Sequence, residues 1–327
     1  RCIWTWPRPV QPSALIAAPC TSSKRVRLLR TGTELSPGPA HPAVALDQVT
    51  VIVVTFNSAH CLPALKTSLD KFAHIIVVDN GSDDGGADLT PQYLPQARVL
   101  ALPSNLGFGA ANNRALAQVT TPFALLLNPD CEITSDAVWG LLDTANAFPE
   151  AAVVAPQLLQ PDGQADINYR WPHLLWKSKG PGVQSGPACV GFVCGAAMLL
   201  RCSAFAQSGY FDEQFFLYYE DDDLCLRLFQ AHLPMIIDPR YTALHKSRGS
   251  VRGKSPWRSE YLRGYHHAQS KLIFARKHQS TAIAITQRRQ LLIETTFALV
   301  LRVLVPSPRL IARMVGRWRG LYDWSAR

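Results

Sequence analysis

The 327-residue sequence lacks any apolar run of the ~18 residues that a membrane-spanning helix needs, and none of its cysteines form a CxxC pair. The closest approach to a membrane span, TTFALVLRVLVPSP, is interrupted by Arg302 and ended by Pro306. Several of the eight cysteines lie in apolar stretches such as VGFVCGAAMLL, where a free thiol acts as a small hydrophobe. We therefore expect a cytoplasmic protein with reduced cysteines rather than a disulfide framework.

The middle of the chain has almost no net charge. The formal net charge is +9, but residues 48–279 carry 19 basic and 20 acidic side chains, and the excess lies in the two ends. An excess of basic charge that is confined to the two ends argues against a nucleic-acid partner. We predict three parts: a flexible basic leader at 1–47, a catalytic domain at 48–279 and a basic amphipathic helical extension at 280–327.

Apolar runs that end in polar residues recur from residue 48 onward. VTVIVVTFN, HIIVVDNGS and FALLLNPD each predict a strand, and HCLPALKTSLDKF, GAANNRALAQV and SDAVWGLLDTANAF predict helices between them, the last one capped by Ser135. Continuous apolar strands indicate a sheet buried on both faces. The expected fold is an α/β open sheet, Rossmann-like and mostly parallel, flanked by helices.

Ligands of such sheets bind at the carboxyl ends of the strands, where this sequence places three polar clusters. The clusters are Thr55–Asn57, Asp79–Ser82 and Asn128–Asp130. By itself, Asp79 could cap a turn or accept hydrogen bonds from a base or ribose. The stretch NLGFGAANN lacks the third glycine of a dinucleotide loop, so hydride transfer is disfavoured, although its glycines permit close approach to a phosphate.

Two residues are candidate metal ligands. Asp130 could be a turn residue or a hard oxygen ligand for a cation that bridges two phosphates. His245 could be structural or could return to the same sheet edge, because one helix and one strand separate it from Asp221.

Four consecutive carboxylates, Glu220 to Asp223, stand in the stretch YFDEQFFLYYEDDDLCLRL. Acidic residues in the first turn of a helix complement its dipole, and this explains such a run without any catalytic role. A crowded carboxylate is also a stronger base, because each neighbouring negative charge raises its proton affinity.

In order along the chain, VTFNS, VVDNGSDDG, NLGFGAANN, LLLNPD, GAAMLLR, the acidic stretch and ALHKSRGS resemble the motifs of family 2 glycosyltransferases, closest to their rhamnosyltransferase-like branch. The resemblance covers about residues 49–278. It implies a GT-A fold, a nucleotide-diphosphate sugar donor, with dTDP-rhamnose favoured, and inversion at the anomeric carbon. Mg²⁺ or Mn²⁺ would be the cofactor.

The resemblance also implies residue roles. The donor would be bound by Thr55, Asn57, Asp79, Asn105, Asn112 and Asn128. Asp130 and His245 would hold the metal, and Asp221, beside Glu220, would be the general base. Two departures leave questions open: the metal motif is Asn-Pro-Asp where many relatives have Asp-x-Asp, and Asp222 replaces an apolar or small residue, so either Asp221 or Asp222 could be the base. Asp223 could cap the helix.

Residues 286–320 mix large apolar side chains with arginine, which fits either a helical hairpin packed on the domain or an interfacial helix pair on an anionic membrane. The expected function is transfer of rhamnose or another deoxyhexose to a saccharide or polyprenyl-linked acceptor in cell-surface polysaccharide synthesis, peripherally at the inner face of the cytoplasmic membrane. The alternatives are a non-catalytic nucleotide-sugar binder and a nucleotidyltransferase, although VTFNSAHCLP lacks the phosphate loop that the latter needs.

Overall fold

A computed structural model describes residues 43–171, 180–246, 249, 256–302 and 307–326. Most of the predicted leader and residues 172–179 lie outside these ranges. The strands are β1 (Val49–Thr55), β2 (His74–Asp79), β3 (Ala97–Ala101), β4 (Phe123–Leu127), β5 (Cys131–Ile133), β6 (Val153–Leu159), β7 (Ala165–Asp166), β8 (Ala188–Val190), β9 (Ala197–Arg201) and β10 (Met235–His245).

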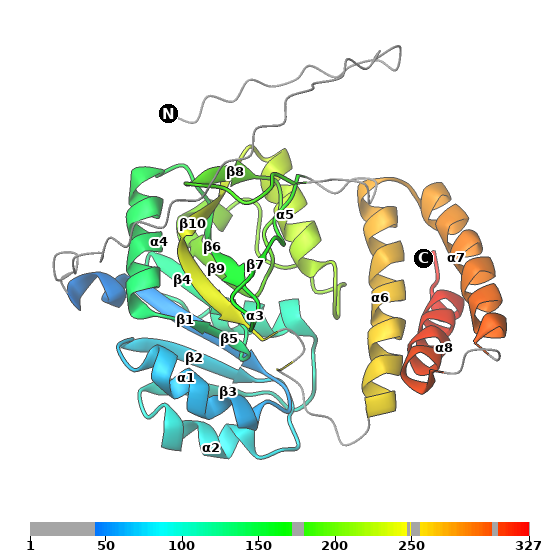
Figure 1. Ribbon diagram of the computed structural model, residues 1–327, viewed down its shortest axis with the longest axis horizontal. Coiled ribbons are helices and arrows are strands. Elements are labelled where there is room, and N and C mark those ends of the chain that lie inside the picture. Colours follow the sequence, from blue (N-terminus) through cyan, green and yellow to red (C-terminus); the bar gives the residue numbers. More distant parts are fainter. Residues whose placement is uncertain (1–42, 172–179, 247–248, 250–255, 303–306, 327) are drawn as a thin grey trace, which may run out of the picture. The chain divides into compact units, whose positions relative to one another are not determined.

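Helices alternate with the strands at first and then gather at the carboxyl end of the chain (Figure 1). They are α1 (Leu62–Leu69), α2 (Gly86–Tyr93), α3 (Phe108–Leu116), α4 (Ser135–Ala147), α5 (Glu220–Gln230), α6 (Pro256–His278), α7 (Thr281–Leu301) and α8 (Pro308–Asp323). Short 3-10 helices are η1 (Ala43–Gln48), η2 (Ala59–Cys61) and η3 (Cys202–Phe205).

The sheet is mixed, with the strand order β3-β2-β1-β4-β9-β6-β10-β5. Its first four strands are parallel, as expected from the helices between them, and Thr55 lies in register with Asp79. Beyond β4 the sheet departs from the mostly parallel arrangement that we predicted, because β9 runs antiparallel to both β4 and β6. The sequence after β6 returns through a loop instead of a crossover helix, which permits the antiparallel pairing.

Both faces of the parallel half are buried, as the apolar runs predicted. Alternate residues of β1 enter two separate cores: Val51 packs in the core that includes Leu65 of α1 and Leu141 of α4, and Ile52 packs in the core that includes Ala111 of α3 and Leu224 of α5. The helix pairs α1/α4 and α3/α5 therefore cover opposite faces.

The N-cap of helix α4 is Thr134, one residue before the residue that we predicted. The side chain of Thr134 accepts a hydrogen bond from the backbone N–H of Ala137, and Ser135 is the first helical residue. The prediction that Ser135 caps this helix is wrong, because the extended residue that precedes the helix is Thr134.

Helices α6, α7 and α8 pack together around a separate small core that includes Leu272, Leu291 and Leu321 (Figure 1). Helices α7 and α8 occupy the predicted extension at 280–327, which is helical as expected. Among the described residues, no helix is both long enough and apolar enough to cross a membrane.

Candidate active site

The ends of β1 and β2 form one hydrogen-bonded turn around Asp79. The Oγ1 of Thr55 donates to Oδ2 of Asp79 over 3.5 Å, and Oδ1 of Asp79 accepts from the N–H of Ser82 over 2.9 Å. Asn57, at φ +53°, accepts from the N–H of Asp83 through its side chain. Asp79 is buried and holds this turn, so the structural interpretation of this residue is confirmed, and its contact with a nucleoside stays a prediction.

Asn80 links this turn to the loop before α3, a role that we did not predict. Its Nδ2 donates to Oδ1 of Asn105 over 3.0 Å, and its Oδ1 accepts from the N–H of Leu106 over 2.8 Å. Asn105 in turn accepts from the N–H of Gly107. The structure thus brings Asn105 to the edge where Asp79 lies. Asn112 lies within α3 instead, where it is buried and donates to the carbonyl of Phe108.

Asp130 and His245 face each other across neighbouring strands. The antiparallel pairing of β5 with β10 places His245 opposite Cys131, and Nε2 of His245 lies 3.7 Å from Oδ1 of Asp130. The N–H of Gly249 donates to Oδ2 of Asp130 over 3.0 Å, and His60 contacts the carbonyl of Gly249. An oxygen and a nitrogen ligand at this separation fit one shared divalent cation.

Within the described ranges, no group of three or more His, Cys, Asp and Glu side chains could hold a metal ion by itself. A cation bound by Asp130 and His245 would therefore need further ligands from a substrate or from water, as Mg²⁺ usually does. Asn128 begins the same turn, and its backbone N–H donates to the carbonyl of Ala196 over 2.9 Å.

The acidic run begins α5 after two strained residues. Tyr218 and Tyr219 have φ values of +69° and +70°, the left-handed region that costs bulky residues energy. Asp221 then accepts from the N–H of Gly195 over 3.3 Å and from the N–H of Asp222 over 2.9 Å. Glu220 is 7% exposed, and its Oε2 has no hydrogen-bond partner among the described residues.

Burial raises the proton affinity of the first three carboxylates. It raises the pKa of Glu220 and that of Asp221, with the Asp221 charge adding to the effect on Glu220. The pKa of Asp222 rises to about 7 through burial and the neighbouring Asp221, despite the opposing influence of Arg170. A carboxylate with a raised pKa is a better proton acceptor near neutral pH.

Arg170 is a site residue that sequence reasoning missed. Its guanidinium forms an ion pair with Asp222 and stacks on the ring of Phe192, 3.6 Å from the centroid. The lone arginine in INYRWPH gives no periodic or motif signal, and 52 residues separate it from its partner. The cation lowers the pKa of Asp221 while burial raises it.

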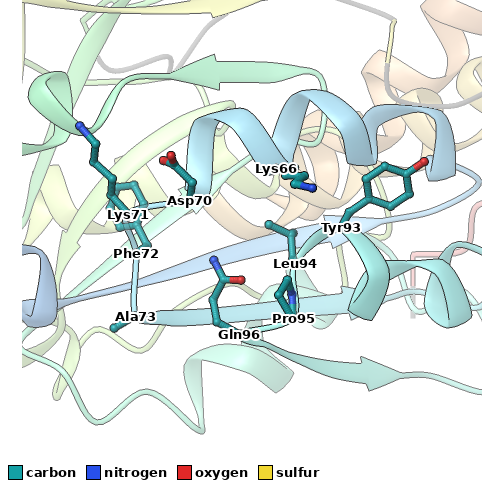
Figure 2. Close-up of a pocket in the computed structure, with 9 residues that line it drawn as sticks. All are labelled: Lys66, Asp70, Lys71, Phe72, Ala73, Tyr93, Leu94, Pro95 and Gln96. Carbon is teal, nitrogen blue, oxygen red and sulfur yellow. The ribbon is translucent and has the colours of Figure 1, made fainter.

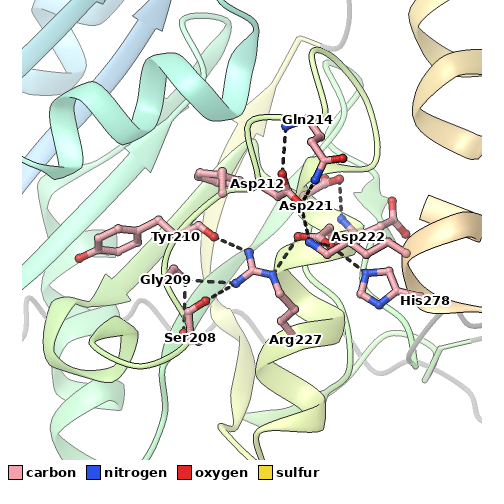
Figure 3. A network of polar contacts seen from close by, with 12 residues as sticks. Ser208, Gly209, Tyr210, Asp212, Gln214, Asp221, Asp222, Arg227 and His278 are labelled. Carbon is pink, nitrogen blue, oxygen red and sulfur yellow. Dashed lines mark hydrogen bonds and ion pairs between the residues drawn. The ribbon is translucent and has the colours of Figure 1, made fainter. Parts of the chain in front are cut away.

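Asp223 does not cap the helix, contrary to our prediction. Its side chain is fully buried and pairs with Arg227 over 2.9 Å, with Lys277 over 2.7 Å and with His278 over 2.7 Å. The guanidinium of Arg227 also donates to the carbonyls of Ser208 and Tyr210 (Figure 3). Burial opposes ionisation, but the hydrogen bonds from His278, Lys277 and Arg227 hold the pKa of Asp223 at about 2.

Helix α6 contacts the whole segment that leads into α5. His266 stacks on Phe216 with ring centroids 4.1 Å apart, and His267 meets the rings of both Tyr218 and Tyr219. Ser270 donates to the carbonyl of Leu217 over 2.9 Å. These contacts offset the strain of the left-handed turn and fix the direction in which α5 begins.

A pocket of about 470 Å³ lies at the other end of the sheet (Figure 2). It is lined by Lys66, Asp70, Lys71, Phe72, Ala73, Tyr93, Leu94, Pro95 and Gln96, which precede β2 and β3. These residues lie at the amino ends of the strands, whereas the carboxylates described above follow the carboxyl ends. This pocket is therefore separate from the candidate active site.

Comparison with known proteins gives the family. Residues 50–209 match the model described as Glycosyl transferase family 2. An N-acetylglucosaminyl-diphospho-decaprenol L-rhamnosyltransferase of Mycobacterium tuberculosis is 28% identical over 266 residues, covering 71% of this chain and 85% of the relative. A pre-mycofactocin glycosyltransferase of the same species is 32% identical, covering 71% of this chain and 49% of the relative.

Among solved structures, the mannosyltransferase PcManGT from Pyrobaculum calidifontis, in complex with GDP-Man and Mn²⁺, aligns with a TM-score of 0.52 at 15% identity. The alignment covers 85% of this chain and 88% of that chain. The fold is thus of the GT-A type, as the resemblance implied. The chain belongs to glycosyl transferase family 2, in which it is similar to the rhamnosyltransferases.

Proposed function

We propose that this glycosyltransferase inverts the anomeric carbon as it moves a sugar, rhamnose or another deoxyhexose, from a dTDP-linked donor to a saccharide carried on a polyprenyl diphosphate. The mycobacterial relative supports this choice, because its name specifies a rhamnosyl group and a diphospho-decaprenol acceptor. The product would enter cell-surface polysaccharide. A nucleotidyltransferase is disfavoured, because the chain belongs to a family of glycosyl transferases.

One structural relationship carries the proposal. The backbone of Gly195 and Ala196 joins the metal-side turn to the acidic helix, because Ala196 accepts from the N–H of Asn128 and Gly195 donates to Asp221. These two hydrogen bonds connect Asp221, the proposed proton acceptor, to the turn that contains Asp130. An inverting transferase needs both groups at one anomeric carbon.

Asp221 is the general base in this proposal. Its carboxylate takes the proton of the acceptor hydroxyl while that oxygen bonds to the anomeric carbon, and the bond from that carbon to the donor diphosphate breaks. The products are the glycosylated acceptor and the nucleoside diphosphate. Asp222 is the less suitable base, because Arg170 occupies one of its oxygens.

Asp130 and His245 would hold Mg²⁺ or Mn²⁺ beside the donor diphosphate. The bound cation would supply neutralisation of the negative charge that grows on the leaving group. Thr55, Asn57, Asp79 and Asn105 would line the nucleoside side, where the β1 and β2 turns present hydrogen-bonding groups. Asn128 would position the donor from the metal-side turn, and Asn112 would support α3 from within. Glu220 would adjoin the base as a buried acid whose pKa is raised by burial and by the Asp221 charge.

The test is a donor screen with the full chain and Mn²⁺ or Mg²⁺. Purified protein is incubated with UDP-, GDP- and dTDP-sugars and a short-chain polyprenyl-diphosphate saccharide, and nucleoside diphosphate release is followed. We expect release from one dTDP-sugar that falls at least about 1000-fold in Asp221→Asn, as expected for loss of a general base. The matched control, Asp222→Asn, should lose only a small part of its activity.

Two other outcomes of the donor screen would contradict this proposal. Equal activity of wild type and Asp221→Asn would exclude Asp221 as the base. Donor binding that needs no metal, together with no turnover on any donor, would favour the non-catalytic nucleotide-sugar binder.

We also propose that the carboxyl-terminal helices attach the enzyme to the inner face of the cytoplasmic membrane. Helix α7 buries Leu291 against its neighbours and exposes Ile293, Phe297 and Val300, which are 72%, 65% and 62% exposed. The i, i+4, i+7 spacing places these three on one helix face. Residues 280–327 also contain eight arginines and two acids, a balance suited to anionic lipids.

Flotation with vesicles tests this attachment. The full chain should bind vesicles that contain anionic lipid and should bind neutral vesicles more weakly. Phe297→Ser should reduce vesicle binding about tenfold or more, because an aromatic side chain that is buried in the bilayer contributes strongly to binding. The control Val183→Ser changes an exposed apolar residue that lies outside the helical extension. Equal loss in both variants would contradict a dedicated face on α7.

A further inference from the structure

Helices α6 and α8 cross at unusually short range because glycines form the contact. A Cβ at Gly264 would overlap the carbonyl of Arg313, and a Cβ at Gly316 would overlap the carbonyl of Tyr261. The crossing therefore presses the α8 backbone against α6 one turn before His267. Arg313 and Arg317 lie one helical turn apart on α8, and the backbone of both adjoins Gly264 of α6.

The cations at this crossing outnumber the nearby carboxylates. Glu260 is shared by Arg263, at 3.1 Å, and Arg313, at 2.6 Å, so a single carboxylate serves both guanidinium groups. Lys271 has Glu294 as its acidic neighbour. Within the described part of the chain, no carboxylate forms an ion pair with Arg317. Four cations against two carboxylates leave an excess of positive charge on this surface.

The same cations adjoin the aromatic turn that precedes the catalytic acids. His267 lies between this cluster and the rings of Tyr218 and Tyr219, with ring centroids 5.6 and 5.4 Å away. Desolvation of the ring and the charges of Arg317, Lys271 and Arg313 lower the pKa of His267 to about 4. The histidine is thus neutral at pH 7, and the positive field there comes from the arginines and lysine.

We propose that Arg263, Lys271, Arg313 and Arg317 form a binding site for the diphosphate of a lipid-linked acceptor. Guanidinium groups suit phosphate oxygens because they donate two parallel hydrogen bonds from a planar fork. His267 contacts Tyr218 and Tyr219, which immediately precede Glu220 and Asp221, so the proposed site adjoins the segment that leads to the base. The inference rests on the proposed function, since it names where that acceptor binds.

The experiment measures binding directly, without any transfer reaction. Geranyl diphosphate is titrated into the full chain by calorimetry, with geraniol as the uncharged probe. The test variant is Arg317→Gln, and Arg309→Gln is the control because Arg309 is an exposed arginine on the same helix. We expect geranyl diphosphate to bind at least about tenfold more weakly to Arg317→Gln, the loss expected for one charged hydrogen-bonding partner, and equally to Arg309→Gln and wild type.

Competition separates this site from the others. A nucleoside diphosphate, dTDP, should leave geranyl diphosphate binding unchanged; displacement by dTDP would place the probe in the donor site and overturn the proposal. Vesicle flotation of Arg317→Gln should match wild type, whereas a parallel loss of vesicle and probe binding would assign the cations to lipid headgroups. Equal binding of geranyl diphosphate by Arg317→Gln and Arg309→Gln would also overturn the proposal.

Two further measurements control for folding and for charge. Arg317→Gln should unfold at the same temperature as wild type, which verifies that the variant is folded. Arg317→Lys, which keeps the charge, should recover part of the affinity for geranyl diphosphate.

These readouts are independent of catalysis. If the donor screen fails but Arg317→Gln still weakens geranyl diphosphate binding, the anion site stands without the proposed transfer. If transfer occurs and both arginine variants have the same acceptor KM, the enzyme is correct and this acceptor site is wrong.

Discussion

Arg170 and Asp222 form an ion pair beside Asp221, within the first turn of α5. The arginine is only partly buried, with a side chain 26% exposed, while Asp222 is 11% exposed. The pair therefore places one cation next to carboxylates whose pKa values are raised by burial, those of Glu220 and Asp221. In the proposed mechanism, the balance between these two influences sets the pH at which Asp221 becomes able to accept a proton.

Arg170→Met should shift activity to higher pH. Burial raises the pKa of Asp221 and the Arg170 charge lowers it, so loss of the charge raises it further. Activity requires the ionised base and rises with pH through this pKa. We expect the acidic limb of the kcat profile to move up by about one unit. Arg114→Met, which loses an exposed pair with Glu213, should leave the limb in place.

Asp222→Asn should produce the opposite shift. The change removes one negative charge and leaves Arg170 without its carboxylate, and both effects stabilise the ionised form of Asp221. The acidic limb should move down by about one unit, with some loss of maximal rate because the base becomes weaker. A profile with the wild-type midpoint would show that the pair does not control the base.

Metal removal should stop turnover reversibly. A chelator is expected to abolish nucleoside diphosphate release, and Mn²⁺ should restore it. Asp130→Asn should raise the Mn²⁺ concentration for half-maximal rate by about tenfold or more, because a carboxylate ligand is lost. Glu132→Gln is the matched control, since Glu132 lies two residues away and pairs with Lys246. The same Mn²⁺ requirement in both variants would rule out Asp130 as a ligand.

Asp223→Asn should destabilise the fold by about 3 kcal/mol at pH 7, because Arg227, Lys277 and His278 lose their buried carboxylate partner. The pKa of Asp223 in the folded protein is about 2, below the value of about 3.9 in an unfolded chain. Its ionisation thus stabilises the fold above pH 4, and this contribution is lost as the pH falls from about 4 to 2.

Urea unfolding at pH 7 and pH 3 measures this effect. The gap in free energy of unfolding between wild type and Asp223→Asn should narrow at pH 3. Glu213→Gln, in which an exposed ion pair is lost, should cost less than about 1 kcal/mol at either pH. A gap of constant size would indicate that the Asp223 carboxylate is not the source of the stability.

Much of the fold follows from local sequence. Apolar runs such as VTVIVVT favour buried strands, and the intervening periodic segments favour helices, so the parallel half of the sheet was predictable. Polar residues at the ends of β1, β2 and β4 then had to converge on one edge, because parallel neighbours end together. The antiparallel β9 was not predictable in this way, since strand direction depends on how a loop returns and leaves no periodic signal.

The sequence by itself determined that four carboxylates would begin a helix near the sheet edge. It did not determine what each of them does. Consecutive helical residues point about 100° apart, so Asp222 meets Arg170, which lies 52 residues earlier, whereas Asp223 meets His278, which lies 55 residues later. Only the tertiary structure brings these distant partners to different sides of one helical turn. Asp221 points in a third direction, where it accepts a hydrogen bond from the backbone N–H of Gly195.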